Sequence, residues 1–229
     1  MRLHAALVAL TLTLVSCASD DTTAPVTDTI IMPGVGSSYT FDGYELDISG
    51  AKVAGSEAQY VYNVVATNST YRDRTGVWAV VIGSGSDSDT LYYSKDASEN
   101  IWFLPGGGEA PFPWMRLPLA TDGVTVETDT TVRSVGAGIE APFITIATLR
   151  HQGTESIVVS GKSITIHKIA ADITFKVSFF GQVQTETTEF TLWYAPSIGL
   201  QARVSAPARE RNGSVENGDF EELISYSLK

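Results

Sequence analysis

The stretch that decides the fold is Asp172-Ile173-Thr174-Phe175-Lys176-Val177-Ser178-Phe179. Its apolar residues occupy every second position and alternate with polar ones. Because successive side chains of a β-strand point to opposite faces, this period of two predicts a strand with one buried and one solvated face. The same alternation recurs in Leu200-Gln201-Ala202-Arg203-Val204-Ser205. The chain is therefore read first as β-structure.

Further alternating segments lie at residues 60–64, 164–166 and 220–228, and helical periodicity is nearly absent. Turn residues separate about eleven to thirteen such segments, a spacing typical of an all-β sandwich or a barrel-like sheet. Ser160-Gly161-Lys162 predicts a tight hairpin turn that joins Ile157–Val159 to Ile164–Ile166. Consecutive hairpins of this kind indicate a largely antiparallel meander.

Two segments stand apart from these strands. One is the small, acidic stretch from Gly83 to Asp89, which we expect to be a solvated turn. The other runs from Trp102 to Pro118 and contains four of the nine prolines together with Phe112, Trp114 and Met115. Long segments without secondary structure are usually functional or disordered. Aromatic side chains among prolines favour an ordered, packed loop.

The N-terminus has the layout of an export signal. Arg2 supplies a positive charge, an apolar run from Ala5 to Val15 follows, and the only cysteine, Cys17, ends it. The run is too short for a spanning helix, which needs about 20 apolar residues. Leu14-Val15-Ser16-Cys17 resembles the lipobox of bacterial lipoproteins, which implies a cleaved signal peptide at 1–16 and a lipid on Cys17. The alternative is an ordinary signal peptide with an incidental thiol.

The residues after Cys17 bear on location. A flexible tether is expected over 17–29, followed by a single domain over 30–229. Ala18 stands where an aspartate would retain some lipoproteins in the inner membrane, which favours the outer membrane. Ala18-Ser19-Asp20-Asp21 also resembles the acidic tethers of surface-exposed lipoproteins. The periplasmic and the surface-facing positions both stay open.

The composition excludes several classes of function. The net charge of −11 at pH 7 repels nucleic acid and anionic lipid surfaces. The single cysteine is assigned to the lipid, so no disulfide is expected. The predicted contact with the membrane is therefore the lipid on Cys17 alone.

The segment Trp193-Tyr194-Ala195-Pro196-Ser197-Ile198-Gly199-Leu200 predicts a tight connection between two strands. Pro196 cannot donate to a ladder, and Gly199 permits a positive φ before the next strand. The segment resembles the W-Y-A-P-G-[VI]-G-L signature of many uncharacterised bacterial lipoproteins, with Ser197 in place of the usual glycine. Gly36–Thr40, Leu91–Tyr93 and Glu155–Val159 also look similar to segments of that family.

What this resemblance implies is a strongly curved antiparallel sheet, similar to the half-barrels of lipoprotein carriers, and no catalytic residue. The residues themselves also provide little chemistry. His151 and His167 lack metal-ligand spacing, Asp87 and Asp89 do not complete a calcium loop, and no nucleophile elbow occurs. We therefore expect no catalytic residue, no metal and no cofactor.

Three functions remain in consideration. The first is non-catalytic binding of an apolar or amphipathic small molecule or lipid, and the aromatic-rich segments propose as its residues Trp102, Phe112, Trp114, Met115, Trp193 and Tyr194. The alternative is a structural or interaction lipoprotein that contacts an envelope protein partner. A glycan hydrolase is the third, with its two carboxylates drawn from Glu186, Glu189, Glu221 and Glu222. The protein is expected not to be an enzyme.

Overall fold

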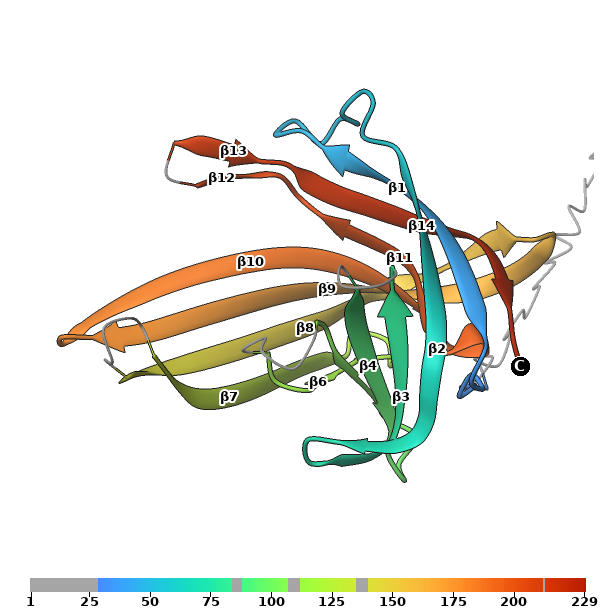
Figure 1. Cartoon of the computed structure of the whole chain (residues 1–229), viewed down its shortest axis with the longest axis horizontal. Helices are drawn as coiled ribbons and strands as arrows, with labels where there is room; N and C mark the ends of the chain where they lie inside the picture. Colours follow the sequence, from blue (N-terminus) through green and yellow to red (C-terminus); the bar gives the residue numbers. More distant parts are fainter. Residues whose placement is uncertain (1–28, 84–87, 107–111, 135–139, 212) are drawn as a thin grey trace, which may run out of the picture.

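A computed structural model describes residues 29–83, 88–106, 112–134, 140–211 and 213–229 (Figure 1). The strands are β1 (Ser38–Leu46), β2 (Ala58–Tyr71), β3 (Arg74–Ile82), β4 (Asp89–Lys95), β5 (Ile101–Leu104), β6 (Met115–Arg116), β7 (Val124–Ser134), β8 (Glu140–Val159), β9 (Lys162–Phe179), β10 (Gln182–Ala195), β11 (Leu200–Ala206), β12 (Arg209–Arg211), β13 (Ser214–Glu216) and β14 (Gly218–Ser227). A 3₁₀ turn, η2 (Pro196–Ile198), separates β10 from β11. The predicted signal peptide, Cys17, nearly all of the tether and residues 84–87 of the acidic turn lie outside the described residues.

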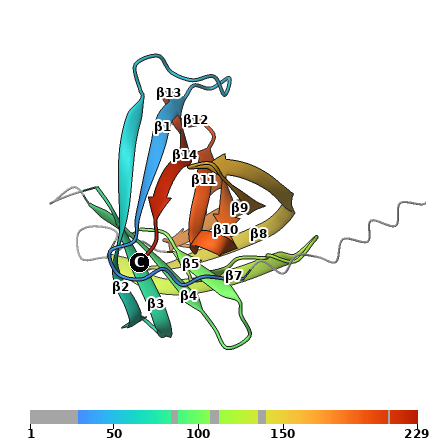
Figure 2. The same cartoon turned by 90° about the vertical axis from the view of Figure 1, so that its right-hand side faces the viewer.

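Twelve of the strands form one antiparallel sheet in the order β6-β5-β4-β3-β2-β1-β14-β11-β10-β9-β8-β7. Neighbouring strands in this order are consecutive in sequence except at two places: β1 pairs with β14, and β14 follows β11 only after a short excursion in which β12 pairs with β13. Figure 2 shows the strands arranged around a common interior, here called the lumen. The predicted all-β, antiparallel, barrel-like meander is confirmed.

The sheet is nearly closed, and its two edges, β6 and β7, meet at a seam without a ladder of backbone pairs. Side chains join the edges there. The hydroxyl of Thr125 on β7 donates a hydrogen bond to the carbonyl of Arg116 on β6, and Arg116 Nε lies 3.9 Å from Glu127 Oε1. Because the same chain runs from β6 into β7, this seam is the only interruption among the described strands of the ring.

One end of the lumen is filled by side chains and closed by the predicted W-Y-A-P segment. Pro196 ends β10 and starts η2, and Gly199 has a φ of +69°, which confirms the predicted strand break. Tyr39 Oη donates to the Ile198 carbonyl at 2.8 Å, and Trp78 Nε1 donates to the Gly199 carbonyl at 3.1 Å. These bonds tie β1 and β3 to the turn across the interior, so this end is fixed.

The N-terminal segment and the C-terminus both lie at the closed end. Ile31 N donates to the Pro196 carbonyl at 2.9 Å, and Gly34 N donates to the Lys229 carbonyl at 3.2 Å. Gly199 lies against Ile31 so closely that a Cβ there would overlap the Ile31 carbonyl. The chain therefore enters its first strand beside η2.

The opposite end is extended by three long strands, β8, β9 and β10 (Figure 1, left). Two-residue turns at positive φ join these strands: Ser160 at +51° before Gly161 joins β8 to β9 on the η2 side, and Phe180 at +47° before Gly181 joins β9 to β10 at the open end (Figure 1). The first confirms the predicted turn after Val159. At the closed end, beyond the pairing of Tyr194 with His167, β8 and β9 continue as a two-stranded ribbon. Among the described residues, none belongs to a helix that could cross a membrane by length and apolarity.

One expectation needs correction. The segment from Trp102 to Pro118 is not a single loop apart from the strands, because Trp102–Leu104 belong to β5 and Met115–Arg116 to β6. The two pieces pair with each other, Trp102 with Arg116 and Phe103 with Met115. The prolines concealed these short strands, since they lie in the connection and just after β6 and not within the ladder.

Candidate functional site

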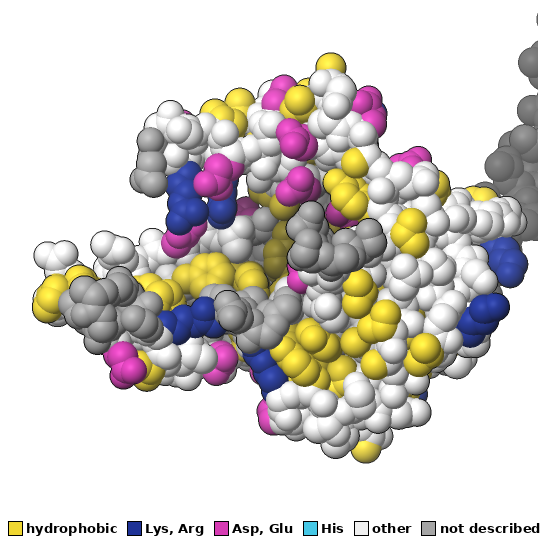
Figure 3. Space-filling view, in the orientation of Figure 1, with side chains coloured by type: hydrophobic (Ala, Val, Ile, Leu, Met, Phe, Trp, Pro, Cys, Tyr) yellow, Lys and Arg dark blue, Asp and Glu magenta, His cyan; other side chains and the backbone are white. Residues whose placement is uncertain are grey.

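The end of the lumen opposite η2 holds a cavity of about 370 Å³, here called the lumen cavity. Its wall is largely apolar and includes six large apolar side chains from β3, β4, β5, the loop before β6, β10 and β11: Ile82, Leu91, Phe103, Phe112, Leu192 and Val204. Figure 3 shows apolar side chains within the hollow between β10 and the β12–β13 hairpin. Concave, mostly apolar spaces of this size are typical of small-molecule sites.

The strand period places these side chains inside. Leu192 pairs with Ile169 and with Val204, so the three lie on one face of β9, β10 and β11. On the far wall, Phe103 pairs with Tyr93, which is fully buried. The sequence alternates so that large residues at the closed end fill the lumen, whereas positions nearer the open end leave space.

Phe112 closes one side of the lumen cavity. Its ring meets Phe175 on β9 edge to face, with centroids 5.6 Å apart, and its carbonyl accepts a hydrogen bond from Arg72 Nη1 at 2.8 Å. This aromatic therefore bridges from the connection before β6 to the inner face of β9. Because Phe112 packs against Phe175 at the side of the lumen cavity, its position can limit the width of the cavity.

A carboxyl group lies in the cavity wall. Tyr62 on β2 donates its phenolic hydrogen to Glu221 on β14, across the intervening β1. Burial raises the pKa of Glu221, and the charge of Asp219 raises it further, while the hydrogen bond from Tyr62 opposes the shift. Burial, followed by the charge of Glu45, also raises the pKa of Asp219. The site thus holds carboxyl groups in partly desolvated surroundings.

The narrow spacing at this point depends on Gly43 of β1. A Cβ at Gly43 would lie 2.7 Å from Cε2 of Tyr60 and 3.2 Å from Cγ of Glu221. Real Cβ atoms do not approach other atoms so closely, so only glycine leaves room for both side chains. The glycine therefore leaves room for the Tyr60 ring beside Glu221, and Glu221 lines the cavity.

Gln201 on β11 adds a second polar group to the same wall. It is 2% exposed, and its Oε1 has no hydrogen-bond partner among the described residues. Gln201 pairs with Tyr194, whose side chain is fully buried, so it shares the lumen face. Buried polar atoms are nearly always paired, and an unpaired one calls for an explanation.

Ion pairs span the open end. Arg209 and Arg211 of the β12–β13 hairpin reach Glu186 on β10, with Arg211 Nη2 2.8 Å from Glu186 Oε2 and Arg209 Nη1 3.7 Å from Glu186 Oε1. Both arginines also pair with Glu216 on β13. Basic and acidic side chains meet in this way across the hollow in Figure 3.

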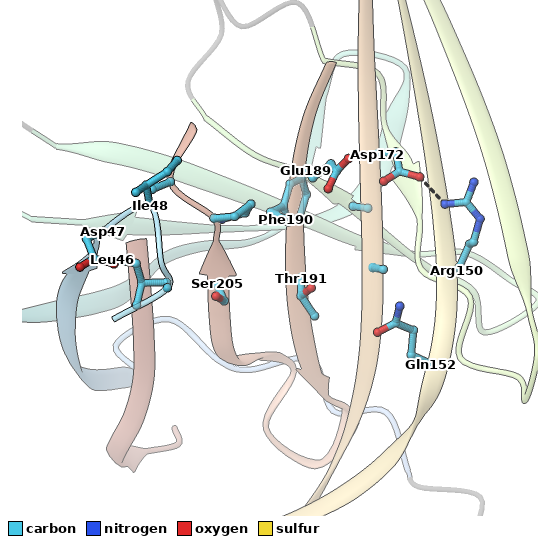
Figure 4. Close-up of a pocket in the computed structure, with 15 residues that line it drawn as sticks. Leu46, Asp47, Ile48, Arg150, Gln152, Asp172, Glu189, Phe190, Thr191 and Ser205 are labelled. Atoms are coloured by element: carbon cyan, nitrogen blue, oxygen red, sulfur yellow. Dashed lines mark hydrogen bonds and ion pairs between the residues drawn. The ribbon is translucent and has the colours of Figure 1, made fainter. Parts of the chain in front are cut away.

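A second hollow of about 640 Å³ lies on the face of β8–β10 that points away from the lumen (Figure 4). The β1–β2 loop, with Leu46 and Ile48, forms one side. On the other side Arg150 forms an ion pair with Asp172. Asp47 and Glu189 also line this groove, and neither forms an ion pair among the described residues.

Comparison with known proteins gives no family. No protein-family model matches the chain, and no curated protein matches it. Three crystal structures superpose loosely on it. An exported protein with a YmcC-like fold from Bacteroides fragilis covers 87% of this chain and 99% of its own, at 12% identity and a TM-score of 0.40.

A lipoprotein from Parabacteroides distasonis also covers 87% of this chain and 99% of its own, at 13% identity and a TM-score of 0.36. The hypothetical lipoprotein YmcC from Escherichia coli covers 82% of this chain and 83% of its own, at 12% identity and a TM-score of 0.35. The identities are too low and the superpositions too loose to transfer a function or a site to this chain.

The structure does not bring the six proposed ligand-binding residues, five aromatics and Met115, to one place. Only Phe112 lines the lumen cavity. Met115 and Tyr194 are fully buried in the core. Trp193 points to the face opposite to that of Tyr194. There Lys168 and Arg203 lie 5.5 and 5.2 Å from the centre of the Trp193 ring, and the indole N–H donates a hydrogen bond to Glu155.

Trp102 and Trp114 belong to a smaller cluster on the outer face, around Val77 and Leu104. Arg74 stacks on the Trp102 ring at 3.4 Å and lies 5.6 Å from Trp114. Burial lowers the pKa of Arg74. Sequence reasoning missed Glu221 and Gln201 as members of one cavity wall, although their apolar neighbours on β11 and β14 alternate clearly.

The two histidines of the domain come together in the structure, although their sequence spacing did not indicate this. His151 Nε2 lies 3.2 Å from His167 Nδ1 across β8 and β9. Burial lowers the pKa of His151, whereas Asp122 opposes the shift. Over the described ranges, no group of three or more His, Cys, Asp or Glu side chains is arranged to hold a metal ion.

Proposed function

We propose that the protein is a cell-envelope lipoprotein, anchored through Cys17, that binds an apolar or amphipathic ligand in the lumen cavity without catalysing its conversion. The observation that carries this proposal is the apolar cavity of about 370 Å³ that the core leaves open at one end of the sheet. The side chains that line an empty cavity lack dispersion contacts on one side. An apolar ligand that fills the cavity supplies those contacts.

The anchor is proposed from residues 14–17, and the outer membrane from Ala18. The geometry fits this arrangement. The first described residues lie beside η2, while the cavity is lined by Ala206 and Asp219 at the other ends of β11 and β14. A lipid on Cys17 would therefore hold the protein by its closed end. Metabolic labelling with palmitate tests the anchor: label on the wild type but not on Cys17→Ser is expected, and an unlabelled wild type would overturn it.

The binding proposal is tested on the purified protein from Ala18 onward. Every strand of the described sheet lies within residues 38–227, so this protein keeps the whole described fold. Native mass spectrometry and solvent extraction should reveal a bound apolar molecule. Val204→Trp fills the cavity and should abolish retention, whereas Val215→Trp, on the exposed β13, should not. A wild type that is empty and takes up neither a fatty acid nor a fatty alcohol contradicts the proposal.

A second function, contact with an envelope partner, is favoured by the tip of the β9–β10 hairpin. Phe180 is 83% exposed there, and Val183 is 64% exposed. Large apolar side chains gathered at an exposed tip are typical of interaction sites. A photo-crosslinker at position 180 should capture one reproducible envelope protein in intact cells, with position 129 on β7 as the control. The absence of any reproducible product would count against this function.

A further inference from the structure

We propose that the lumen cavity takes an amphipathic amine, whose apolar part lies against Phe103, Leu192 and Val204 and whose protonated amino group lies against Glu221, Asp219 and Gln201. This inference rests on the function proposed above and names the chemistry of its ligand. It rests on the negative charges and hydrogen-bond acceptors of the cavity wall.

The charged groups that line this cavity are carboxylates, which only accept hydrogen bonds when ionised. Glu221 and Asp219 stand two residues apart on β14, so both carboxyl groups point from the same face. Asp219 in turn feels the charge of Glu45, its partner on β1. In the part of the chain that the structure describes, no Lys, Arg or His forms an ion pair with any of these three.

Two other acids close to this site do have cationic partners. On the outer face of the same strand, Glu222 pairs with Arg203, and at the mouth Glu186 pairs with two arginines. Glu221 is half-buried, so its charge carries part of the cost of desolvation that a cation would offset, whereas Asp219 is exposed. Among the residues that the structure describes, the one donor that reaches Glu221 is the hydroxyl of Tyr62. Both carboxyl groups retain lone pairs for further donors.

Gln201 points to a ligand independently of the acids. Its side chain is 98% removed from solvent and lines the same cavity, yet its Oε1 accepts no hydrogen bond from the described residues. A buried carbonyl oxygen without a donor costs about 1–3 kcal/mol. A ligand that brings a donor would remove this penalty.

These observations select among amphiphiles. A carboxylate or phosphate head would be repelled by the acids and would give Gln201 no donor. An alcohol offers one donor, whereas an ammonium group offers three donors and a compensating charge. A quaternary ammonium has the charge but no N–H. Both the charge and the donors of a primary amine are therefore needed to satisfy the wall.

The test compares four probes that share a twelve-carbon chain: dodecylamine, dodecyltrimethylammonium, dodecanol and dodecanoate. Each is titrated below its critical micelle concentration into the protein from Ala18 onward. Dodecylamine should bind about tenfold or more tightly than dodecanol, because a charge-assisted hydrogen bond contributes about 1.5–3 kcal/mol. Dodecyltrimethylammonium should fall between them, and dodecanoate should bind most weakly.

Variants locate the amino group. Glu221→Gln and Gln201→Leu should each weaken dodecylamine about tenfold and leave dodecanol within about twofold. Glu222→Gln, one residue away on the outer face, is the matched control and should change neither. Thermal unfolding of each variant verifies that it is folded, and Asp219→Asn replaces any variant that is not.

The outcomes separate the two proposals. If dodecanol or dodecanoate binds as tightly as dodecylamine, the amine inference is overturned while binding of an apolar ligand stands. The same holds if Glu221→Gln leaves dodecylamine unaffected. If none of the four probes binds, the proposed function itself fails.

Discussion

Glu221 and Glu222 are neighbours on β14, yet they lie in opposite settings: the first accepts a hydrogen bond from Tyr62 inside the lumen, and the second pairs with Arg203 on the outer face. We therefore expect the same substitution to have opposite effects on stability at the two positions. Glu221→Gln keeps the acceptor for Tyr62 but removes a partly desolvated charge, so it should raise the melting temperature at pH 7. Glu222→Gln loses an ion pair and should lower the free energy of unfolding by up to about 1 kcal/mol.

The pH dependence has a defined direction. The pKa of Glu221 is higher in the folded protein than in the unfolded chain, because of burial first and Asp219 second. The folded state therefore holds the proton more firmly, and this group's penalty on stability grows as the pH rises through its pKa values. The advantage of Glu221→Gln should disappear on acidification to about pH 4, near the unperturbed pKa. An advantage that is the same at every pH would contradict this reading of Glu221.

Gly43→Ala should test the packing beneath this pair. The new methyl group would lie 2.7 Å from the Tyr60 ring and 3.1 Å from the Phe220 carbonyl, so we expect a loss of about 1–3 kcal/mol in the free energy of unfolding. Chemical denaturation measures it. Combining the change with Tyr60→Leu should recover part of the loss, since one of the two clashes is removed. Full additivity of the two variants would show that they do not interact.

Phe180→Asn should stabilise the β9–β10 hairpin. Phe180 has a φ of +47° and precedes Gly181 at +76°, a turn in which asparagine before glycine is preferred. Left-handed backbone at other residues costs about 1–2 kcal/mol, so a gain of up to about 1 kcal/mol is expected. Phe180→Ala keeps the unfavourable φ and serves as the control. If alanine stabilises as much as asparagine, the gain comes from removing the exposed ring and not from the turn.

Glu186→Gln should loosen the open end without unfolding the protein. The carboxylate meets Arg209 and Arg211 at a half-exposed position, so its loss should cost less than about 1 kcal/mol. Release of a bound amphiphile, followed by stopped-flow fluorescence, should become faster. For the wild type, raising the salt to about 1 M should accelerate release in the same way, since the Debye length falls to about 3 Å. Release from the variant should then be insensitive to salt.

Much of the architecture could be predicted because it is local. The alternation in Ile173–Phe179, the turn at Ser160 and the break at Pro196 each follow from residues close in sequence, and each is present in the structure. The position of β14 between β1 and β11 could not be predicted, since it joins the two ends of the chain. Pairing of this kind depends on tertiary contacts that a local pattern does not encode.

The candidate site was harder to predict for a related reason. Alternation shows that Trp193 and Tyr194 point to opposite faces, but it does not show which face lines the lumen. Trp102 proved to lie outside, and Gln201, which looks like an outward polar residue, lies within. A bulge in the pairing of β10 with β11, beside Tyr194, shifts the register there. Only the register of the folded sheet brings Gln201 and Glu221 to one wall.

The seam between β6 and β7 has a mechanical consequence. Elsewhere in the described sheet, adjacent strands are joined by backbone pairing, whereas between β6 and β7 the contacts seen among the described residues include the hydrogen bond of the Thr125 hydroxyl and the long ion pair of Arg116 with Glu127. The sheet can therefore widen between β6 and β7 without breaking the backbone hydrogen bonds between any two paired strands. A sheet that can widen at one seam accommodates ligands of different width. The polar groups of the cavity then select the ligand more than its diameter does.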